Sequence, residues 1–214
     1  ASLNTARPLA QVAREAAGRL SRTLDMPVSV VEVGGDELLI TAFESPAHNP
    51  LRDAVIDRIP YLPPFGVAFA AWDATEAQRD WVSRGSAGDT DLERRLHAVL
   101  ARTRDRGYDV DWMTPALAQI AHALGAISVD TLPAGLRPII DQLRVELASG
   151  IVDDEFTGGD RTVATISAPA LDDAGHTRLI LGVHPMLPMS APDIDHVAQQ
   201  LLAEIRALVS DNLD

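Results

Sequence analysis

Hydrophobic and polar residues alternate on both sides of a turn near the end of the chain. The residues Asp-Asp-Ala-Gly at 172–175 separate two runs rich in Val, Ile, Leu and Thr, which is typical of a β-hairpin. A four-residue loop pairs Leu171 with His176, so odd positions of the first strand share a face with even positions of the second. One predicted face is apolar and belongs to the core: Ala164, Ile166, Ala168, Leu179, Leu181 and Val183.

The opposite face of this hairpin is mixed in character. A hydroxyl and an imidazole lie among apolar groups there, which is the composition that a small-molecule site needs. Its predicted members are Val163, Thr165, Ser167, Ile180, Gly182 and His184.

Apolar residues at helical spacing predict three long helices. The first covers residues 7–24, with Pro8 in its first turn. The second covers residues 89–106 and ends at Gly107. The third begins after Ser190, its expected N-cap, and runs toward the end of the chain.

Turn and loop residues place the remaining elements. The Gly-Gly-Asp sequence at 34–36 predicts a second hairpin with strands at 27–33 and 37–43. Other expected elements are a short helix at 51–56, an extended segment at 59–66, a short helix at 67–72, a helix capped by Thr75 that ends at Val82, helices at 112–124 and 136–148, and an acidic loop at 153–160. Together they predict one α+β domain over residues 1–214, with a largely antiparallel sheet, both terminal helices on one face and a helical insertion at about 112–160.

Charge and composition exclude several classes of function. The formal net charge is −13 and all 18 basic residues are arginine, so a polyphosphate backbone would be repelled. The chain has no cysteine, which excludes disulfide and thiolate chemistry and is typical of a cytoplasmic protein. No apolar window is long enough for a membrane span.

The motifs of common enzymes and cofactor sites are absent from the sequence. Without lysine there is neither a P-loop nor a Schiff base, and no G-x-S-x-G elbow occurs. The six histidines lack metal-ligand spacing, and the acidic groups at 153–155 and 172–173 lack the spaced ligands of a calcium loop. We therefore expect that the protein binds no cofactor and no metal and is not an enzyme.

Three local signatures occur in a definite order along the chain. They are Gly66-Val-Ala-Phe-Ala-Ala71, then Arg106-Gly-Tyr-Asp-Val-Asp111, then Ile166-Ser-Ala-Pro-Ala-Leu-Asp172 with Leu181-Gly-Val-His-Pro185. In this order they resemble the effector-binding domain of IclR-type bacterial transcription regulators, which has a GAF-like fold. The chain departs from that family at Val67, where a lysine is usual, at the insertion, and in lacking the winged helix-turn-helix that precedes the domain.

The resemblance implies a pocket for a small organic effector. It is formed by one face of the sheet, the loop before the Gly66 helix, the aspartate after Gly-Tyr, and the hairpin. Carried over position by position, the effector-binding residues are Pro64, Phe65, Gly66, Asp111, Val163, Thr165, Gly182 and His184. The resemblance also implies dimers or tetramers, and DNA binding only through a missing N-terminal part.

Each candidate also has a simpler structural interpretation. Thr165 and His184 suit a ligand, or equally an ordinary strand end. Pro63 and Pro64 remove backbone donors and so favour a larger, more apolar acid, or they form a rigid loop that seats Phe65. Asp111 accepts a hydrogen bond from a ligand, or it caps the helix expected at 112–124.

These observations favour a ligand-sensing regulatory domain. Two alternatives remain open at this point: a small enzyme with His184 and Asp111 as an acid–base pair, and an interaction module that has no pocket.

Overall fold

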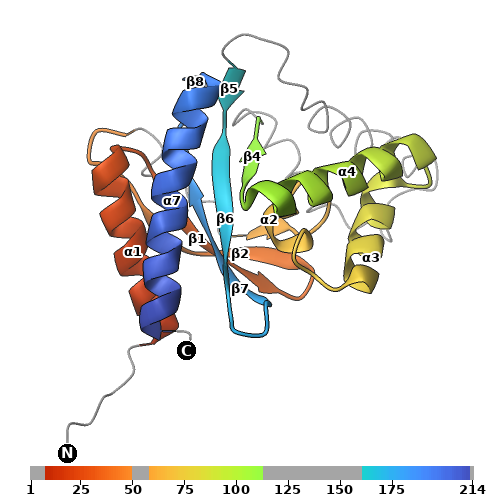
Figure 1. Cartoon of the computed structure of the whole chain (residues 1–214), viewed down its shortest axis with the longest axis horizontal. Helices are drawn as coiled ribbons and strands as arrows, with labels where there is room; N and C mark the ends of the chain where they lie inside the picture. Colours follow the sequence, from red (N-terminus) through yellow and green to blue (C-terminus); the bar gives the residue numbers. More distant parts are fainter. Residues whose placement is uncertain (1–7, 50–57, 113–160, 213–214) are drawn as a thin grey trace, which may run out of the picture.

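A six-stranded antiparallel sheet lies at the centre of the protein (Figure 1). The structure is a computed structural model that describes residues 8–49, 58–112 and 161–212. The strand order is β3 (Arg58–Pro60), β2 (Glu37–Glu44), β1 (Val28–Gly34), β7 (Thr177–Val183), β6 (Thr165–Leu171) and β4 (Asp109–Asp111). Each neighbouring pair in this order is antiparallel. The short strands β5 (Arg161–Val163) and β8 (Leu187–Met189) form a separate two-stranded sheet.

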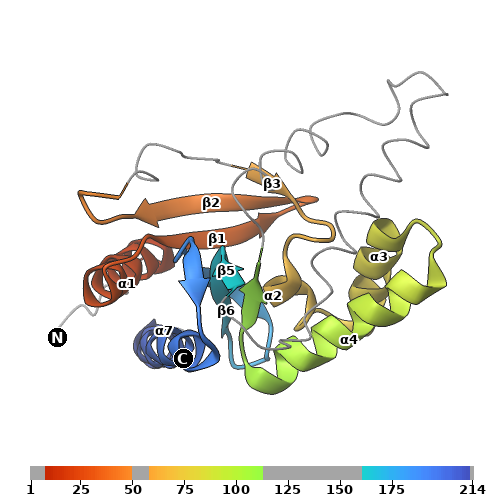
Figure 2. The ribbon, with the colours of Figure 1, turned by 90° about the horizontal axis from the view of Figure 1, so that it is seen from above.

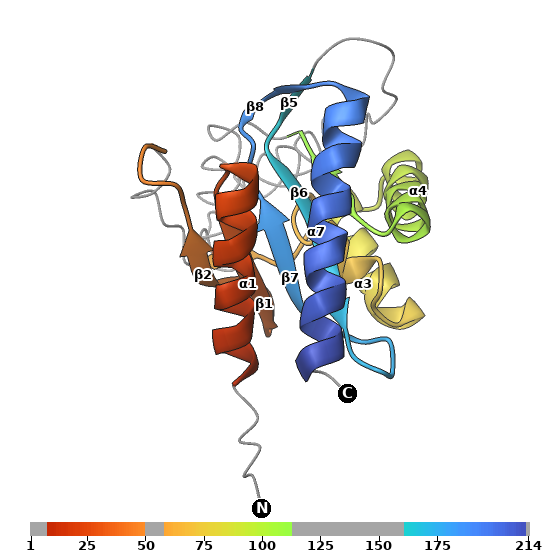
Figure 3. The ribbon, with the colours of Figure 1, turned by 60° about the vertical axis from the view of Figure 1, so that its left-hand side comes forward.

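Helices cover both faces of the central sheet. The terminal helices α1 (Leu9–Leu24) and α7 (Ala191–Asn212) lie side by side on one face (Figures 1 and 3). The helices α2 (Val67–Ala70), α3 (Thr75–Ser86) and α4 (Thr90–Arg106) lie on the other side (Figure 2). This arrangement confirms the predicted α+β class, with its antiparallel sheet and both terminal helices on one face.

Two apolar cores follow from the alternation along the strands. Leu179 and Leu181 of β7 pack with α1 and α7 in the first core, and Ile180 between them faces the second core, under α2, α3 and α4. Successive residues of a strand point to opposite faces, so the sheet separates the two cores. The candidate pocket lies on the side of the second core.

Two of the helix ends, at Gly107 and Ser190, are as the sequence predicts, and Asp89 is a further cap that the structure adds. The Asp89 carboxylate accepts hydrogen bonds from the N–H groups of Asp91 (2.9 Å) and Leu92 (3.0 Å) at the start of α4. Gly107, with φ of 87°, ends the same helix in the left-handed conformation. Ser190 and Asp193 each accept from the backbone N–H of the other, at 3.4 Å, where α7 begins.

The predicted pairing of the hairpin was wrong by one residue beside the turn and by two residues along the rest of the strands. Leu171 pairs with Thr177 rather than His176, and an irregularity beside it brings Ile166 opposite Val183. The turn is longer than predicted because the Asp172 carboxylate accepts hydrogen bonds from the N–H groups of Ala174 and His176. A shift by two residues preserves which side chains share a face, so the predicted faces of β6 and β7 hold.

The start and end of α3 also differ from the prediction. Ala74 is the N-cap, with no side-chain hydrogen bond, so Thr75 is not the cap. The helix continues past Val82 to Ser86 because Gly85 and Ser86 are buried and extend its packed side. The helices predicted at 51–56 and 136–148, nearly all of that at 112–124, and the loop at 153–160 lie outside the described residues. Within the described part, no helix is long and apolar enough to cross a membrane.

Replacing Asp89 by alanine is expected to lower the free energy of unfolding by about 1 kcal/mol, because two N–H groups at the start of α4 lose their acceptor. Asp89→Asn keeps a side-chain oxygen at this position and should recover most of the loss. Urea denaturation of both variants measures the difference. Equal destabilisation by alanine and asparagine would show that the cap contributes little.

Candidate functional site

A cavity of about 120 Å³ lies between the central sheet and the segment that leads into α2. Small residues on three neighbouring strands leave space on the sheet side of the cavity. Ser29 of β1 lies opposite Gly182 of β7, and Gly182 lies opposite Ser167 of β6. Aliphatic and aromatic side chains form most of its wall. The lining residues are Ser29, Val31, Leu38, Ile40, Ile59, Pro64, Phe65, Gly66, Val67, Ala68, Phe69, Asp109, Asp111, Thr165, Ser167, Ile180, Gly182 and His184.

His184 connects two strands at one end of this cavity. It follows directly after β7, where its backbone N–H donates to the Pro27 carbonyl at 2.9 Å. Its ring nitrogens lie within hydrogen-bond distance of two hydroxyls, with Nδ1 3.1 Å from Thr165 Oγ1 and Nε2 2.9 Å from Ser29 Oγ. The ring therefore bridges β1 and β6 across β7.

Gly182 makes room for this bridge. A Cβ at this position would lie 3.0 Å from Ser29 Oγ and 3.3 Å from Thr165 Cγ2. Any larger residue would press on the Ser29 hydroxyl and on the Thr165 methyl group, so glycine here meets a steric need of this polar group rather than a backbone requirement.

The imidazole of His184 is neutral at pH 7. Burial lowers its pKa to about 4, because the charged form would lose its hydration. The Phe43 ring, with its centroid 5.6 Å away, adds to the apolar surroundings. A neutral imidazole has one donor and one acceptor nitrogen, and the two hydroxyls match either assignment.

The segment before α2 is held against the cavity from outside. The Trp81 indole N–H of α3 donates to the Phe65 carbonyl at 3.1 Å, and the Phe65 N–H donates to Leu62 at 2.8 Å. Gly66 has φ of 82°, and a Cβ there would lie 2.5 Å from the Tyr61 ring. These contacts fix Pro64 and Phe65 at the cavity wall.

Two carboxyl groups approach the cavity from β4. Asp109 Oδ1 accepts from Thr103 Oγ1 at 3.2 Å and lies 3.4 Å from Arg106 Nη2, so its charge is partly balanced. Asp111 pairs with Thr165 in the strand ladder and lines the cavity as well. Its alternative role as a cap for 112–124 concerns residues outside the described part.

The structure places all but one of the predicted site residues around this single cavity: Pro64, Phe65, Gly66, Asp111, Thr165, Gly182 and His184. Val163 is the exception and is a correction. The strand breaks at Ala164, and Val163 belongs to β5, where it pairs with Leu187 of β8. It is fully buried in the core beneath α1 and α7, so it does not share a face with Thr165.

Ser29 is the important residue that the sequence analysis missed. It is the one polar position in the otherwise apolar start of β1, Val28–Val31, and that break in the pattern was the available signal. The β1–β7 pairing that brings it to His184 is a long-range contact, which local periodicity does not reveal. Asp109 was also missed as a lining residue, although it lies within the quoted Gly-Tyr motif.

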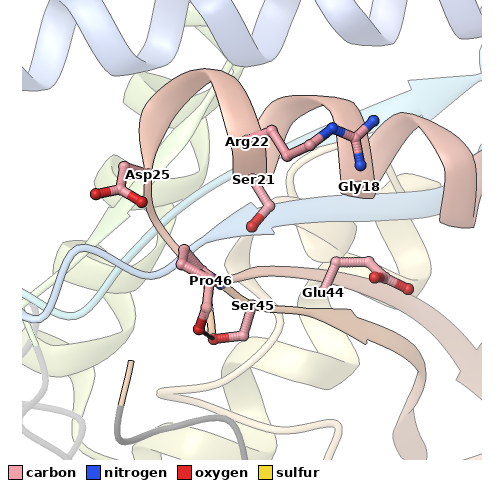
Figure 4. A pocket seen from close by; sticks show the side chains of 7 residues that line it. All are labelled: Gly18, Ser21, Arg22, Asp25, Glu44, Ser45 and Pro46. Carbon is pink, nitrogen blue, oxygen red and sulfur yellow. Dashed lines mark hydrogen bonds between the residues drawn. The ribbon is translucent and has the colours of Figure 1, made fainter. Parts of the chain in front are cut away.

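A second hollow, of about 230 Å³, lies at the end of α1 (Figure 4). Ser21 points from α1 toward the end of β2, where Glu44, Ser45 and Pro46 form the other wall. Charged side chains border this hollow, and Glu44 already pairs with Arg14 at 3.1 Å. The smaller cavity is the better candidate because apolar surface supplies most of the affinity for small molecules. Within the described residues, no cluster of His, Asp and Glu is arranged to hold a metal ion.

Comparison with known proteins finds similarity in structure only. No family model and no curated protein matches the sequence. An IclR transcriptional regulator from Alicyclobacillus acidocaldarius superposes with a TM-score of 0.61 at 14% identity, covering 96% of this chain and 68% of the other. The inducer-binding domain of PobR from Acinetobacter, a double mutant solved with 3-hydroxybenzoic acid, superposes with a TM-score of 0.58 at 16% identity, covering 96% and 99%.

A third similar structure also carries a bound molecule. An IclR homologue from Microbacterium hydrocarbonoxydans, solved with 4-hydroxybenzoate, superposes with a TM-score of 0.57 at 16% identity and covers 95% of this chain and 67% of the other. The described protein therefore has the fold of IclR-type effector-binding domains. The resemblance predicted from the three sequence signatures is confirmed at the level of the fold.

Proposed function

We propose that this chain is a ligand-sensing regulatory domain that binds a compact organic effector in the cavity beside His184. The observation that carries the proposal is the cavity itself, which combines an apolar wall with a few convergent polar groups at one end. The regulators that share the fold, some solved with aromatic acids, support the same function.

The volume of the cavity limits the apolar part of the effector. An engineered apolar cavity of about 150 Å³ holds benzene, so the 120 Å³ available here suits a body of about one ring. The proposal keeps the apolar effector that the sequence predicts. The cavity volume, however, restricts the effector to a smaller size than Pro63 and Pro64 led us to expect.

Regulation requires that the effector bind one arrangement of the protein better than another, since equal affinity shifts no equilibrium. We propose that α1 and α7, which form one outer layer (Figure 3), carry self-association into dimers or tetramers. The signal would then pass to a DNA-binding part at the N-terminal side. The acidic charge of this chain supports placing DNA contacts elsewhere.

The two rival functions are less well supported. An acid–base enzyme needs an imidazole that can take up a proton near pH 7, whereas His184 has a lowered pKa and hydroxyls at both ring nitrogens. An interaction module without a pocket needs a filled sheet face, and a cavity lies there instead.

A screen of small aromatic and aliphatic compounds by thermal shift tests the proposed function. Compounds that bind the cavity should raise the Tm of the wild type by several degrees. They should fail to do so for Ile40→Phe, because Ile40 lines the cavity and a phenyl ring would fill it. Val33→Phe, at an exposed position of β1 outside the lining, is the matched control.

Two outcomes of this screen count against the proposal. The first is an equal Tm shift in Ile40→Phe, which would place the compounds elsewhere on the protein. The second is tight binding of a two- or three-carbon acid, which would contradict an apolar effector of ring size.

A further inference from the structure

The hydrogen bonds of His184 fix what the polar end of the cavity offers to a guest. If the Thr165 O–H donates to Nδ1, then the Nε2–H donates to Ser29 Oγ. The Ser29 hydroxyl then keeps its own proton free to donate to a ligand. The opposite tautomer reverses these roles. In either case one of the two hydroxyls keeps a proton to donate and the other presents lone pairs.

We propose that the effector is a neutral molecule that carries a hydroxyl, an alcohol or a phenol, and that this hydroxyl binds between Ser29 and Thr165. The inference rests on the proposed function and names the chemical class of the effector. A ligand hydroxyl both donates and accepts, so it satisfies both ends of the Ser29–His184–Thr165 chain at once. Because the ring can change tautomer, the match holds in either orientation of the ligand.

A carboxylate fits this chemistry less well. A carboxylate only accepts hydrogen bonds. Its oxygens would therefore face the lone pairs of one of the two hydroxyls, with no proton between them. Asp109 and Asp111 line the same cavity, and the other polar side chains of the described lining are the neutral Ser29, Ser167, Thr165 and His184. Like charges at close range in an apolar cavity repel strongly, so the lining selects against an anion.

A protonated amine also matches poorly. An ammonium group only donates, so the hydroxyl that keeps its proton would have no acceptor on the ligand. Of the two lining carboxyls, Asp109 already interacts with Thr103 and Arg106. Burying a hydrated ammonium against the surrounding aliphatic wall is costly, whereas a neutral hydroxyl costs much less.

Four single-ring probes of similar size separate these chemistries: phenol, toluene, benzoate and benzylamine. Each probe is titrated into the whole 214-residue chain and its binding is monitored by NMR. We expect phenol to bind with about tenfold higher affinity than toluene. The difference corresponds to one to two net hydrogen bonds. Benzoate and benzylamine should bind more weakly than phenol.

Variants of the polar chain test its role directly. Thr165→Val and Ser29→Ala should each reduce the phenol preference over toluene by about five- to tenfold and leave toluene binding nearly unchanged. Thr177→Val is the matched control, because Thr177 lies on β7 outside the lining and its buried hydroxyl has no hydrogen-bond partner in the described structure. This control should keep the full phenol preference.

The outcomes distinguish this inference from the proposed function. Absence of binding by all four probes would overturn both. Binding of toluene with no preference for phenol, or the tightest binding by benzoate or benzylamine, would overturn the hydroxyl inference and leave a ligand-binding domain. A phenol preference that persists in both Thr165→Val and Ser29→Ala would also overturn it.

Discussion

Replacing Gly85 by alanine is expected to lower the free energy of unfolding by about 2 kcal/mol, although alanine is the better helix former. Gly85 lies in α3 against Pro63. A Cβ at this position would lie 2.2 Å from Pro63 Cγ and 2.4 Å from Pro63 Cβ. Both atoms belong to a rigid ring, so no flexible side-chain end can move aside.

The strain should also reach the cavity. Relief requires α3 to move away from the segment that contains Pro63, Pro64 and Phe65, and the last two of these line the cavity. Trp81 of α3 holds the Phe65 carbonyl in place, so the same movement would weaken that hydrogen bond. Gly85→Ala is therefore expected to lower the affinity for any cavity ligand as well as the stability.

Gly18→Ala is the matched control for this prediction. Gly18 lies in α1 at the edge of the second hollow (Figure 4). The nearest atoms to its added Cβ are Arg22 Nη1 at 3.5 Å and Glu44 Cγ at 3.9 Å, which are ordinary contacts. This substitution should stabilise the protein by up to about 1 kcal/mol. Urea denaturation measures both, and stabilisation by both variants would show that the contact with Pro63 is easily relieved.

The sequence predicts the faces of the β6–β7 hairpin better than its pairing. The side-chain period of a strand is two residues, so the placement of Thr165, Gly182 and His184 together survives a register error of two. Val163 did not survive, because the break at Ala164 leaves no trace in the alternation of the sequence. Periodicity carries information on faces only as long as a strand is continuous.

Long-range contacts explain what the sequence could not reveal about the site. Ser29 is separated from His184 by most of the chain, and only the β1–β7 pairing brings them together. Pro64 and Phe65 were assigned through the family resemblance, and their position depends on Trp81 and Gly85 of α3. Neither contact has a local signature, whereas the end of α4 at Gly107 is encoded within one helical turn and was predicted.

The stability of the protein is expected to fall by roughly 3 kcal/mol from His184 alone when the pH is lowered from 7 to below 4. In the unfolded chain this histidine takes up a proton near its ordinary pKa of 6.5, whereas in the folded protein burial lowers the pKa to about 4. Between these values the unfolded state holds more protons than the folded state. The contribution is thus complete above pH 6.5 and is lost progressively as the pH falls toward 4.

Comparison with His184→Gln isolates this contribution. Other ionisable groups are present in both proteins, among them the carboxyls of Asp109 and Asp111 that line the same cavity, so their contributions largely cancel in the comparison. Glutamine keeps an amide that can bond to the Ser29 and Thr165 hydroxyls but cannot be protonated. The unfolding free energy of the wild type minus that of the variant should therefore decrease by roughly 3 kcal/mol between pH 7 and pH 4.

A direct titration guards against a variant that folds poorly. The NMR signal of the His184 ring in the wild type should stay unchanged through pH 6.5 and move only near pH 4, because protonation would place an uncompensated charge among Phe43 and the two hydroxyls. A ring that titrates near pH 6.5 in the folded protein would mean that water reaches it freely. The neutral, two-sided hydrogen bonding on which hydroxyl recognition depends would then be lost as the pH falls below about 6.5.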